Sequence, residues 1–237
     1  ANKDRIYRIT TKINSARVND VFATTAPLVQ DHISGYTEQI ESLIVINDGF
    51  SGSVRVNESE MNLSGIYSDA AFLETFSFPL KAGNIKTALN DPFSLVITEK
   101  TAIRLFGHSE VMGKSLEVEG KGLFKITGVM QDYPKSSHLQ FESLVSYNTL
   151  HAIDKGLIKR YDDYRFYTNT YTYLLLKEGV APDDLEEPLA KIAGALTTPE
   201  EQIGLRLQPL TSIVSGEDMN YQIGPVFDRL TMAFFIF

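Results

Sequence analysis

The sequence predicts an α+β fold in which both ends of the chain build one split β-α-β domain, with a small mixed α/β domain inserted between them. Three observations lead to this prediction. The order strand, helix, strand occurs near each end, and the segment between has strands and a helix of its own. A chain of 237 residues with 43% hydrophobic content is also long enough to bury a substantial core in one or two domains.

The first strand-helix-strand unit lies near the start of the chain. Residues 5–9 predict a strand, after which Thr25 suits a helix cap and Pro27 the first helical turn, so a short helix should begin there. The apolar run 43–46 is bounded by turn residues and predicts a buried strand. Residues 47–49 (Asn-Asp-Gly) predict a hairpin turn after it, because these residue types tolerate positive φ.

The second unit lies far downstream and repeats the same order. Residues 171–176 predict a strand, and residues 181–184 open a helix with acidic side chains in its first turn, which suits the helix dipole. Residues 203–210 alternate in polarity and predict the closing strand. The inner face of the helix should be formed by apolar residues at intervals of four, three and four, namely Leu185, Leu189, Ile192 and Leu196.

The segment between the two units carries a complete set of elements and therefore predicts a domain instead of a long loop. Residues 94–97 predict a strand, Thr98 caps a short helix, and Gly107 ends it. A hairpin should follow over residues 116–129. We place the first half-domain at residues 1–60, the inserted domain at 61–142 and the second half-domain at 143–229.

Charge and composition exclude several classes of protein. Lys plus Arg total 22 against 30 for Asp plus Glu, so the net charge of -8 argues against a general nucleic-acid binder. Residues 1–20 are basic by contrast, which we interpret as a solvated strand face, with a docking patch as the alternative. The chain has no cysteine, and this excludes disulfides, thiolate zinc sites and cysteine nucleophiles.

The last eight residues, 230–237, carry no charge. A membrane span needs about twenty apolar residues, so this run predicts the beginning of a truncated transmembrane helix. A buried C-terminal strand or helix is the alternative that the run by itself leaves open.

A search for chemical motifs gives no catalytic, cofactor-binding or metal-ligating residue. Residues 107–115 (Gly-His-Ser-Glu-Val-Met-Gly-Lys-Ser) have five residues between the glycines where a P-loop needs four, and they leave a helix instead of entering one. Residues 49–53 place the second glycine too close to the serine for a nucleophile elbow. The side chains of Phe72, Phe76 and Phe78 are expected to pack in a core. The histidines are scattered and are expected at the surface or at helix caps; they are His32, His108, His138 and His151.

Short motifs occur one after another through most of the chain. They are Tyr67-Ser68-Asp69, Phe72, Phe76-Ser77-Phe78-Pro79-Leu80, Gly83-Asn84, Leu89, Val96-Ile97-Thr98-Glu99, Ala102, Leu105-Phe106-Gly107, Gly113-Lys114 and Ile126-Thr127-Gly128-Val129. Residues 4–8 and 208–211 flank the series. In this order the motifs resemble the periplasmic core domain of MacB-like ABC transporter permeases, a family also called FtsX-like.

The resemblance implies a porter-like subdomain formed by both ends of the segment and a small inserted Sabre-like subdomain. It also implies a place on the outer, periplasmic side of the inner membrane, between two transmembrane helices of the permease. The implied partners are the protein's own transmembrane helices, a cytoplasmic ATP-binding subunit or domain, a second copy in a homodimeric permease, and in some members a periplasmic adaptor. The fragment by itself is expected to be a monomer.

By resemblance, the function is non-catalytic coupling of cytoplasmic ATP hydrolysis to periplasmic conformational change (mechanotransmission), in a transporter of the efflux or the lipoprotein and peptide export class. No cofactor is expected in this segment. An extracytoplasmic ligand-binding or sensor domain is the alternative, and it predicts a closed pocket with convergent polar groups. A soluble hydrolase is a third hypothesis, which requires a nucleophile and a base close in space.

Overall fold

The computed structural model describes residues 2–56, 58–133, 137–153, 169–214 and 219–224. These residues form two compact units. Unit 1 holds the described parts of Ala1–Val45, Ser137–Leu139 and Lys159–Phe237, and unit 2 those of Ile46–Ser136 and Gln140–Ile158. The first unit is therefore assembled from both ends of the chain. Unit 2 begins at Ile46, where the sequence placed the division at residue 61, because the strand hairpin that follows Ile46 pairs within unit 2.

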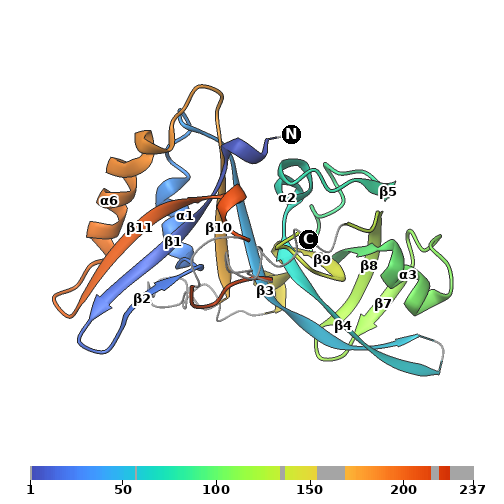
Figure 1. Ribbon diagram of the computed structural model, residues 1–237. Helices are drawn as coiled ribbons and strands as arrows, with labels where there is room; N and C mark the ends of the chain where they lie inside the picture. The colour runs from blue at the N-terminus through green and yellow to red at the C-terminus, as the bar shows by residue number, and fades with distance from the viewer. Residues whose placement is uncertain (1, 57, 134–136, 154–168, 215–218, 225–237) are drawn as a thin grey trace, which may run out of the picture. The chain divides into compact units, whose positions relative to one another are not determined.

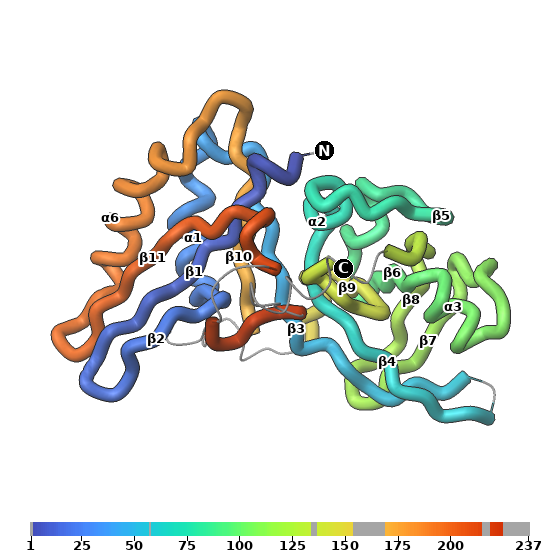
Figure 2. Tube along the Cα trace, in the orientation of Figure 1, coloured from blue at the N-terminus to red at the C-terminus, as the bar shows by residue number. Residues whose placement is uncertain are grey.

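The sheet of unit 1 takes strands from both ends of the chain. They are β1 (Ile6–Ser15), β2 (Asn19–Phe22), the first part of β3 (Ile40–Val56), β10 (Thr170–Leu176) and β11 (Glu201–Pro209). Strand β1 pairs antiparallel with β11 on one side, and on the other side with β10 near its start and β2 further along. The blue β1 and the orange-red β11, remote in sequence, run side by side in the trace (Figure 2).

Helices cover one face of this sheet. The helix α1 (Pro27–Ile33) begins at the predicted proline, and α6 (Glu186–Leu196) follows the short 3-10 turn η2 (Pro182–Leu185). Both lie on the same side of β1 and β11 (Figure 1). The predicted inner face of α6 is confirmed, and its side chains join residues of α1, β1, β10 and β11 in one core. Further 3-10 turns are η1 (Lys3–Arg5) and η3 (Leu210–Ser212).

Unit 2 has a mixed sheet. Besides the rest of β3, its strands are β4 (Ser59–Ser68), β5 (Leu80–Gly83), β6 (Ser94–Thr98), β7 (Ser115–Val118), β8 (Gly122–Met130) and β9 (Ser143–Ser146). Their order is β3, β4, β9, β6, β8, β5. The pairs β4 with β9 and β6 with β8 are parallel, whereas β7 and β8 form the predicted antiparallel hairpin. A mixed α+β fold class is thus confirmed.

The helices of unit 2 are α2 (Ala70–Thr75), α3 (Glu99–Phe106) and α4 (Asn148–Ile153). The limits of α3 are those the sequence predicts. The hydroxyl of Thr98 accepts a hydrogen bond from the Thr101 amide at 3.1 Å, and Gly107 ends the helix with a φ of 80°, which favours glycine.

Phenylalanine rings form much of the core beside α2, as expected. The rings of Phe72 and Phe78 stack with centroids 5.2 Å apart, and Phe76 and Phe141 contact Phe72 at 5.1 and 5.5 Å. Both Phe72 and Phe78 are buried, while Phe76 is half-buried. Packing therefore accounts for these aromatic side chains.

The predicted hairpin turn at residues 47–49 is wrong. Strand β3 continues to Val56, and its register against β4 shifts between Asn47 and Phe50, where two residues face one on the partner strand. The amide of Gly49 donates to the side-chain oxygen of Asn47 at 3.0 Å, so these residues form a bulge. Apolar Phe50, Val54 and Val56 continue the buried face beyond the bulge and keep the chain extended.

The C-terminal run 230–237, predicted as the beginning of a transmembrane helix, lies outside the described residues. Among the helices that the structure describes, none is long and apolar enough to cross a membrane.

Candidate functional site

The stretch from Gly107 to Ser115 has glycine and lysine in common with a P-loop, but its geometry is different. It runs from the end of α3 to the start of β7, the reverse of the strand-to-helix order that binds phosphate. The Lys114 Nζ atom lies 3.2 Å from His108 Nε2 and 5.0 Å from the centre of the Phe106 ring. The lysine thus packs against its own neighbours.

The histidines remain apart in the structure. Those at 32, 108 and 151 are exposed, as predicted, but the prediction is wrong for His138, which is only 7% exposed. Its Nε2 lies 3.1 Å from the hydroxyl of Tyr173 on β10. Within the described ranges, no three His, Asp or Glu side chains are grouped closely enough to hold a metal ion.

A buried arginine, Arg8, lies on β1 in unit 1. The basic start of the chain was predicted to be a solvated strand face, and for Arg8 this is wrong, since its exposure is 0%. Its Nε and Nη2 atoms donate to Gln208 Oε1 at 3.1 and 2.5 Å, and Nη2 also donates to Gln222 Oε1 at 3.2 Å. Its Nη1 atom has no hydrogen-bond partner in the described part of the chain. The guanidinium is therefore held by neutral amide oxygens.

The charge of Arg8 acts on the titratable groups beside it. Burial, and then the Arg8 charge, lower the pKa of His138 from 6.5 to about 4, so the imidazole is neutral at pH 7. Burial raises the pKa of Tyr173, against the opposing effect of Arg8. A protonated phenol and a neutral imidazole form a suitable hydrogen-bonded pair.

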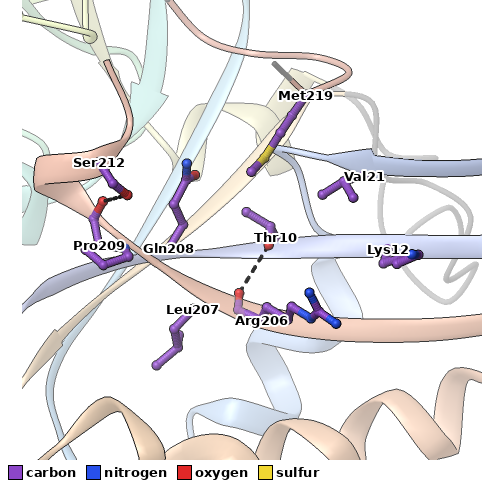
Figure 3. A pocket seen from close by; sticks show the side chains of 9 residues that line it. All are labelled: Thr10, Lys12, Val21, Arg206, Leu207, Gln208, Pro209, Ser212 and Met219. Atoms are coloured by element: carbon purple, nitrogen blue, oxygen red, sulfur yellow. Dashed lines mark hydrogen bonds between the residues drawn. The ribbon is translucent and has the colours of Figure 1, made fainter. Parts of the chain in front are cut away.

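A pocket of about 300 Å³ opens beside this cluster, over β1 and β11 (Figure 3). The side chain of Gln208 joins the two features, because it lines the pocket and accepts from Arg8. Two hydrogen bonds lie in the wall: the Thr10 hydroxyl donates to the Arg206 carbonyl at 3.3 Å, and the Ser212 hydroxyl to the Pro209 carbonyl at 2.9 Å. The pocket is lined by Thr10, Lys12, Val21, Arg206, Leu207, Gln208, Pro209, Ser212 and Met219.

Met219 is held over the pocket by backbone hydrogen bonds of the next residue. The Asn220 amide donates to the Val21 carbonyl and the Ala23 amide donates to the Asn220 carbonyl, both at 2.9 Å. The ring of Tyr221 stacks on Phe22 at the end of β2, with centroids 5.8 Å apart. The segment around residue 220 thus closes one side of the pocket against β2.

The substitution Gln208→Glu should raise the stability of the protein at pH 7 by about 1 kcal/mol. Arg8 is already desolvated, and a carboxylate at residue 208 would replace neutral hydrogen bonds by charge-assisted ones, which are about twice as strong. Urea unfolding measures the change. Gln202→Glu, at an exposed position of the same strand, is the matched control. A Gln208→Glu protein no more stable than this control would contradict the expectation.

Both the sequence and the fold are similar to those of known proteins. The family model for the MacB-like periplasmic core domain matches residues 1–192. No protein with a curated description matches the chain significantly.

Several solved structures are similar to this fold. A domain of a protein assigned as a permease from Porphyromonas gingivalis is 19% identical with a TM-score of 0.74, over 100% of this chain and 98% of that one. The periplasmic region of MacB from Actinobacillus actinomycetemcomitans is 14% identical with a TM-score of 0.61, over 89% and 91%. The extracellular domain of the ABC-type transporter YknZ from Gram-positive bacteria is 16% identical with a TM-score of 0.56, over 84% and 98%.

Proposed function

Because this chain belongs to the MacB-like periplasmic core domain family, we propose that it couples cytoplasmic ATP hydrolysis to a conformational change outside the membrane, without catalysis of its own. Members of the family are periplasmic domains of ABC transporter permeases, which have transmembrane and ATPase partners. The match over residues 1–192 carries the proposal. In this proposal the domain changes its conformation or position during the transport cycle.

The architecture supports a mechanical role. Unit 1 corresponds to a porter-like subdomain made from both ends of the chain, and unit 2 to an inserted Sabre-like subdomain. This assignment shifts the bounds expected from the sequence, which were residues 1–60 and 143–229 for the porter-like halves and 61–142 for the insert, because unit 2 begins at Ile46. Strand β3 contributes Ile40–Val45 to the first unit and Ile46–Val56 to the second, so the chain passes from one unit to the other within this strand. A domain of this kind transmits movement through packed elements and needs no reactive side chain.

One buried carboxyl group among the described residues bears on the proposal that the domain has no catalysis of its own. The group most like a catalytic acid is Asp69, whose pKa is raised by burial and whose Oδ1 atom has no hydrogen-bond partner in the described ranges. It precedes α2, and the backbone amide of Phe72 lowers its pKa in opposition to burial. The residue thus has the position of a helix N-cap.

The proposed partners are those of a dimeric permease. They are the protein's own transmembrane helices, a cytoplasmic ATP-binding subunit or domain, a second copy of the permease, and a periplasmic adaptor. The proposed location is the inner membrane, with this segment on the periplasmic side. Efflux and the export of lipoproteins or peptides are the transport classes we propose.

Removal of the domain tests the proposal. In the full-length permease, replacement of residues 1–229 by a short Gly-Ser linker should leave basal ATP hydrolysis in place but abolish transport and its stimulation of the ATPase. Western blotting of membranes controls for insertion and amount. A shortened permease that exports at the wild-type rate would overturn the proposal.

The absence of catalysis has its own test. Asp69→Asn, His138→Gln and Tyr173→Phe should each retain transport in proportion to the amount of folded protein, because no bond is made or broken here. Transport assays normalised to protein in the membrane measure this. A loss of a hundredfold or more at unchanged stability would instead identify a catalytic group and favour the hydrolase hypothesis.

A further inference from the structure

The pocket over β1 and β11 is lined by positively charged side chains, although the chain as a whole is acidic. The chain as a whole carries 30 acidic and 22 basic residues, yet the lining includes Lys12 and Arg206 and no carboxylate. Neither cation forms an ion pair with any described residue. In the pocket of unit 2 near α3, by contrast, Arg104 pairs with Glu142 at 2.8 Å. Among the described residues that line the pocket on β1 and β11, no carboxylate balances these cations, whereas Asp183 and Glu186 line a separate pocket that Arg206 also borders.

The register of the strands places these cations on one face. Thr10 faces Arg206 across the β1 and β11 pair, and Lys12 lies two residues further along β1. Residues related in this way have side chains on the same face, with β-carbons somewhat less than about 7–8 Å apart. Both side chains are exposed, and an anion bound between their charged ends would reduce the repulsion between them. Figure 3 shows both side chains beside the same pocket.

Besides Lys12 and Arg206, the pocket has a third potential hydrogen-bond donor, the side-chain amide of Gln208, which the buried Arg8 orients. A guanidinium has only donors, so Gln208 must present its amide oxygen to Arg8, as the distances of 3.1 and 2.5 Å show. The NH2 group of the same amide is thereby left to donate elsewhere, and Gln208 lines the pocket. Arg8 therefore orients the Gln208 amide so that its NH2 group is the part left to donate to a ligand, and the charge of Arg8 lies next to this pocket residue.

We infer that this pocket binds an oxyanion, a phosphate or carboxylate group, between Lys12, Arg206 and the amide NH2 of Gln208. Lysine and arginine are the side chains that pair most strongly with such groups. The volume of about 300 Å³ admits a ligand of about ten non-hydrogen atoms. Val21 and Met219 give one wall an apolar character, which suits a short apolar tail on the anion. This ligand site goes beyond the coupling role and does not depend on it.

Titration followed by NMR tests the inference on the 237-residue chain labelled with 15N, in a buffer free of phosphate. The probes are inorganic phosphate and octyl phosphate, with octanol as the neutral comparison. Both anions should shift the amides of residues 10–12 and 206–208, and octanol should not. Tighter binding of octyl phosphate than of phosphate would assign an amphiphile headgroup, whereas equal binding would assign a free oxyanion; each result supports the site. Added NaCl should weaken the binding.

Matched substitutions show whether the named cations carry the affinity. Lys12→Gln and Arg206→Gln should each raise the dissociation constant for octyl phosphate about threefold to fivefold, and the double variant at least tenfold. Lys125→Gln and Arg55→Gln alter exposed strand cations of unit 2 and should change it less than twofold. Absence of shifts with both anions, equal binding of octanol, or a double variant within twofold of wild type would each overturn the inference. Coupling of transport to ATP hydrolysis would stand in any of these cases.

Discussion

Lowering the pH from 7 to 4 should reduce the free energy of unfolding by about 3 kcal/mol through His138 alone. Its pKa is about 4 in the folded protein, against 6.5 in the unfolded chain. Well above pH 6.5 the imidazole is neutral in both states, so its contribution there is constant. As the pH falls from 6.5 towards 4, the unfolded chain takes up the proton and the folded protein does not, at about 1.4 kcal/mol per pKa unit. Urea unfolding at a series of pH values measures the loss.

A variant isolates the contribution of this residue. His138→Gln keeps a polar side chain beside Tyr173 but removes the titrating group, so its stability should fall less between pH 6.5 and pH 4 than that of the wild type. His32→Gln, at an exposed position, should keep the wild-type dependence. If His138→Gln and the wild type lost stability in parallel over this range, burial would not hold the imidazole neutral.

The second large effect is expected at Gly65 on β4, where Gly65→Ala should destabilise the protein by about 3 kcal/mol. A Cβ atom there would overlap the backbone oxygen and the hydroxyl of Ser143 on the neighbouring strand β9. Ser143 is fully buried, and its hydroxyl donates to the Ser64 carbonyl at 2.8 Å, so it cannot move aside without breaking that bond. Backbone shifts of this kind cost up to about 3 kcal/mol or occasionally more.

A second glycine provides the matched control. Gly194 lies in α6, and a Cβ there would meet no atom within 4 Å. Gly194→Ala should therefore stabilise the protein by about 0.5–1 kcal/mol, because alanine favours the helix. Urea unfolding of both variants gives the comparison. A Gly65→Ala protein as stable as Gly194→Ala would mean that β4 and β9 do not approach as closely as described.

Local signals predicted the elements well where one residue type decides the geometry. Pro27 begins α1, and Thr98 and Gly107 delimit α3, because cap and turn residues act through their own backbone and nearest amides. The same reasoning failed at residues 47–49. Whether Asn-Asp-Gly forms a hairpin turn or a bulge depends on the strand that pairs with it, and that strand comes later in the chain.

The candidate site could not be predicted because its parts come together only in the tertiary fold. Arg8 is a basic residue in a basic segment, and nothing near it in sequence indicates burial. It is buried because β1 lies between β10 and β11, which bring Tyr173 and Gln208 to it from more than 160 residues away. His138 is likewise buried through its contact with Tyr173. The order of elements around residues 107–115, by contrast, was readable from the sequence, since the stretch leaves α3 and enters β7 as expected.

The coupling role is tested most directly by the distance between two copies of this domain in the full-length permease. The chain has no cysteine, so Lys191→Cys on α6 and, separately, Lys125→Cys on β8 give single exposed labelling sites within it. After removal of any cysteines elsewhere in the permease, electron paramagnetic resonance would measure the distance between spin labels in the two copies. We predict that the distance distribution changes between the nucleotide-free and ATP-bound states for at least one site. Superimposable distributions at both sites, in a permease that still hydrolyses ATP and transports, would contradict the account.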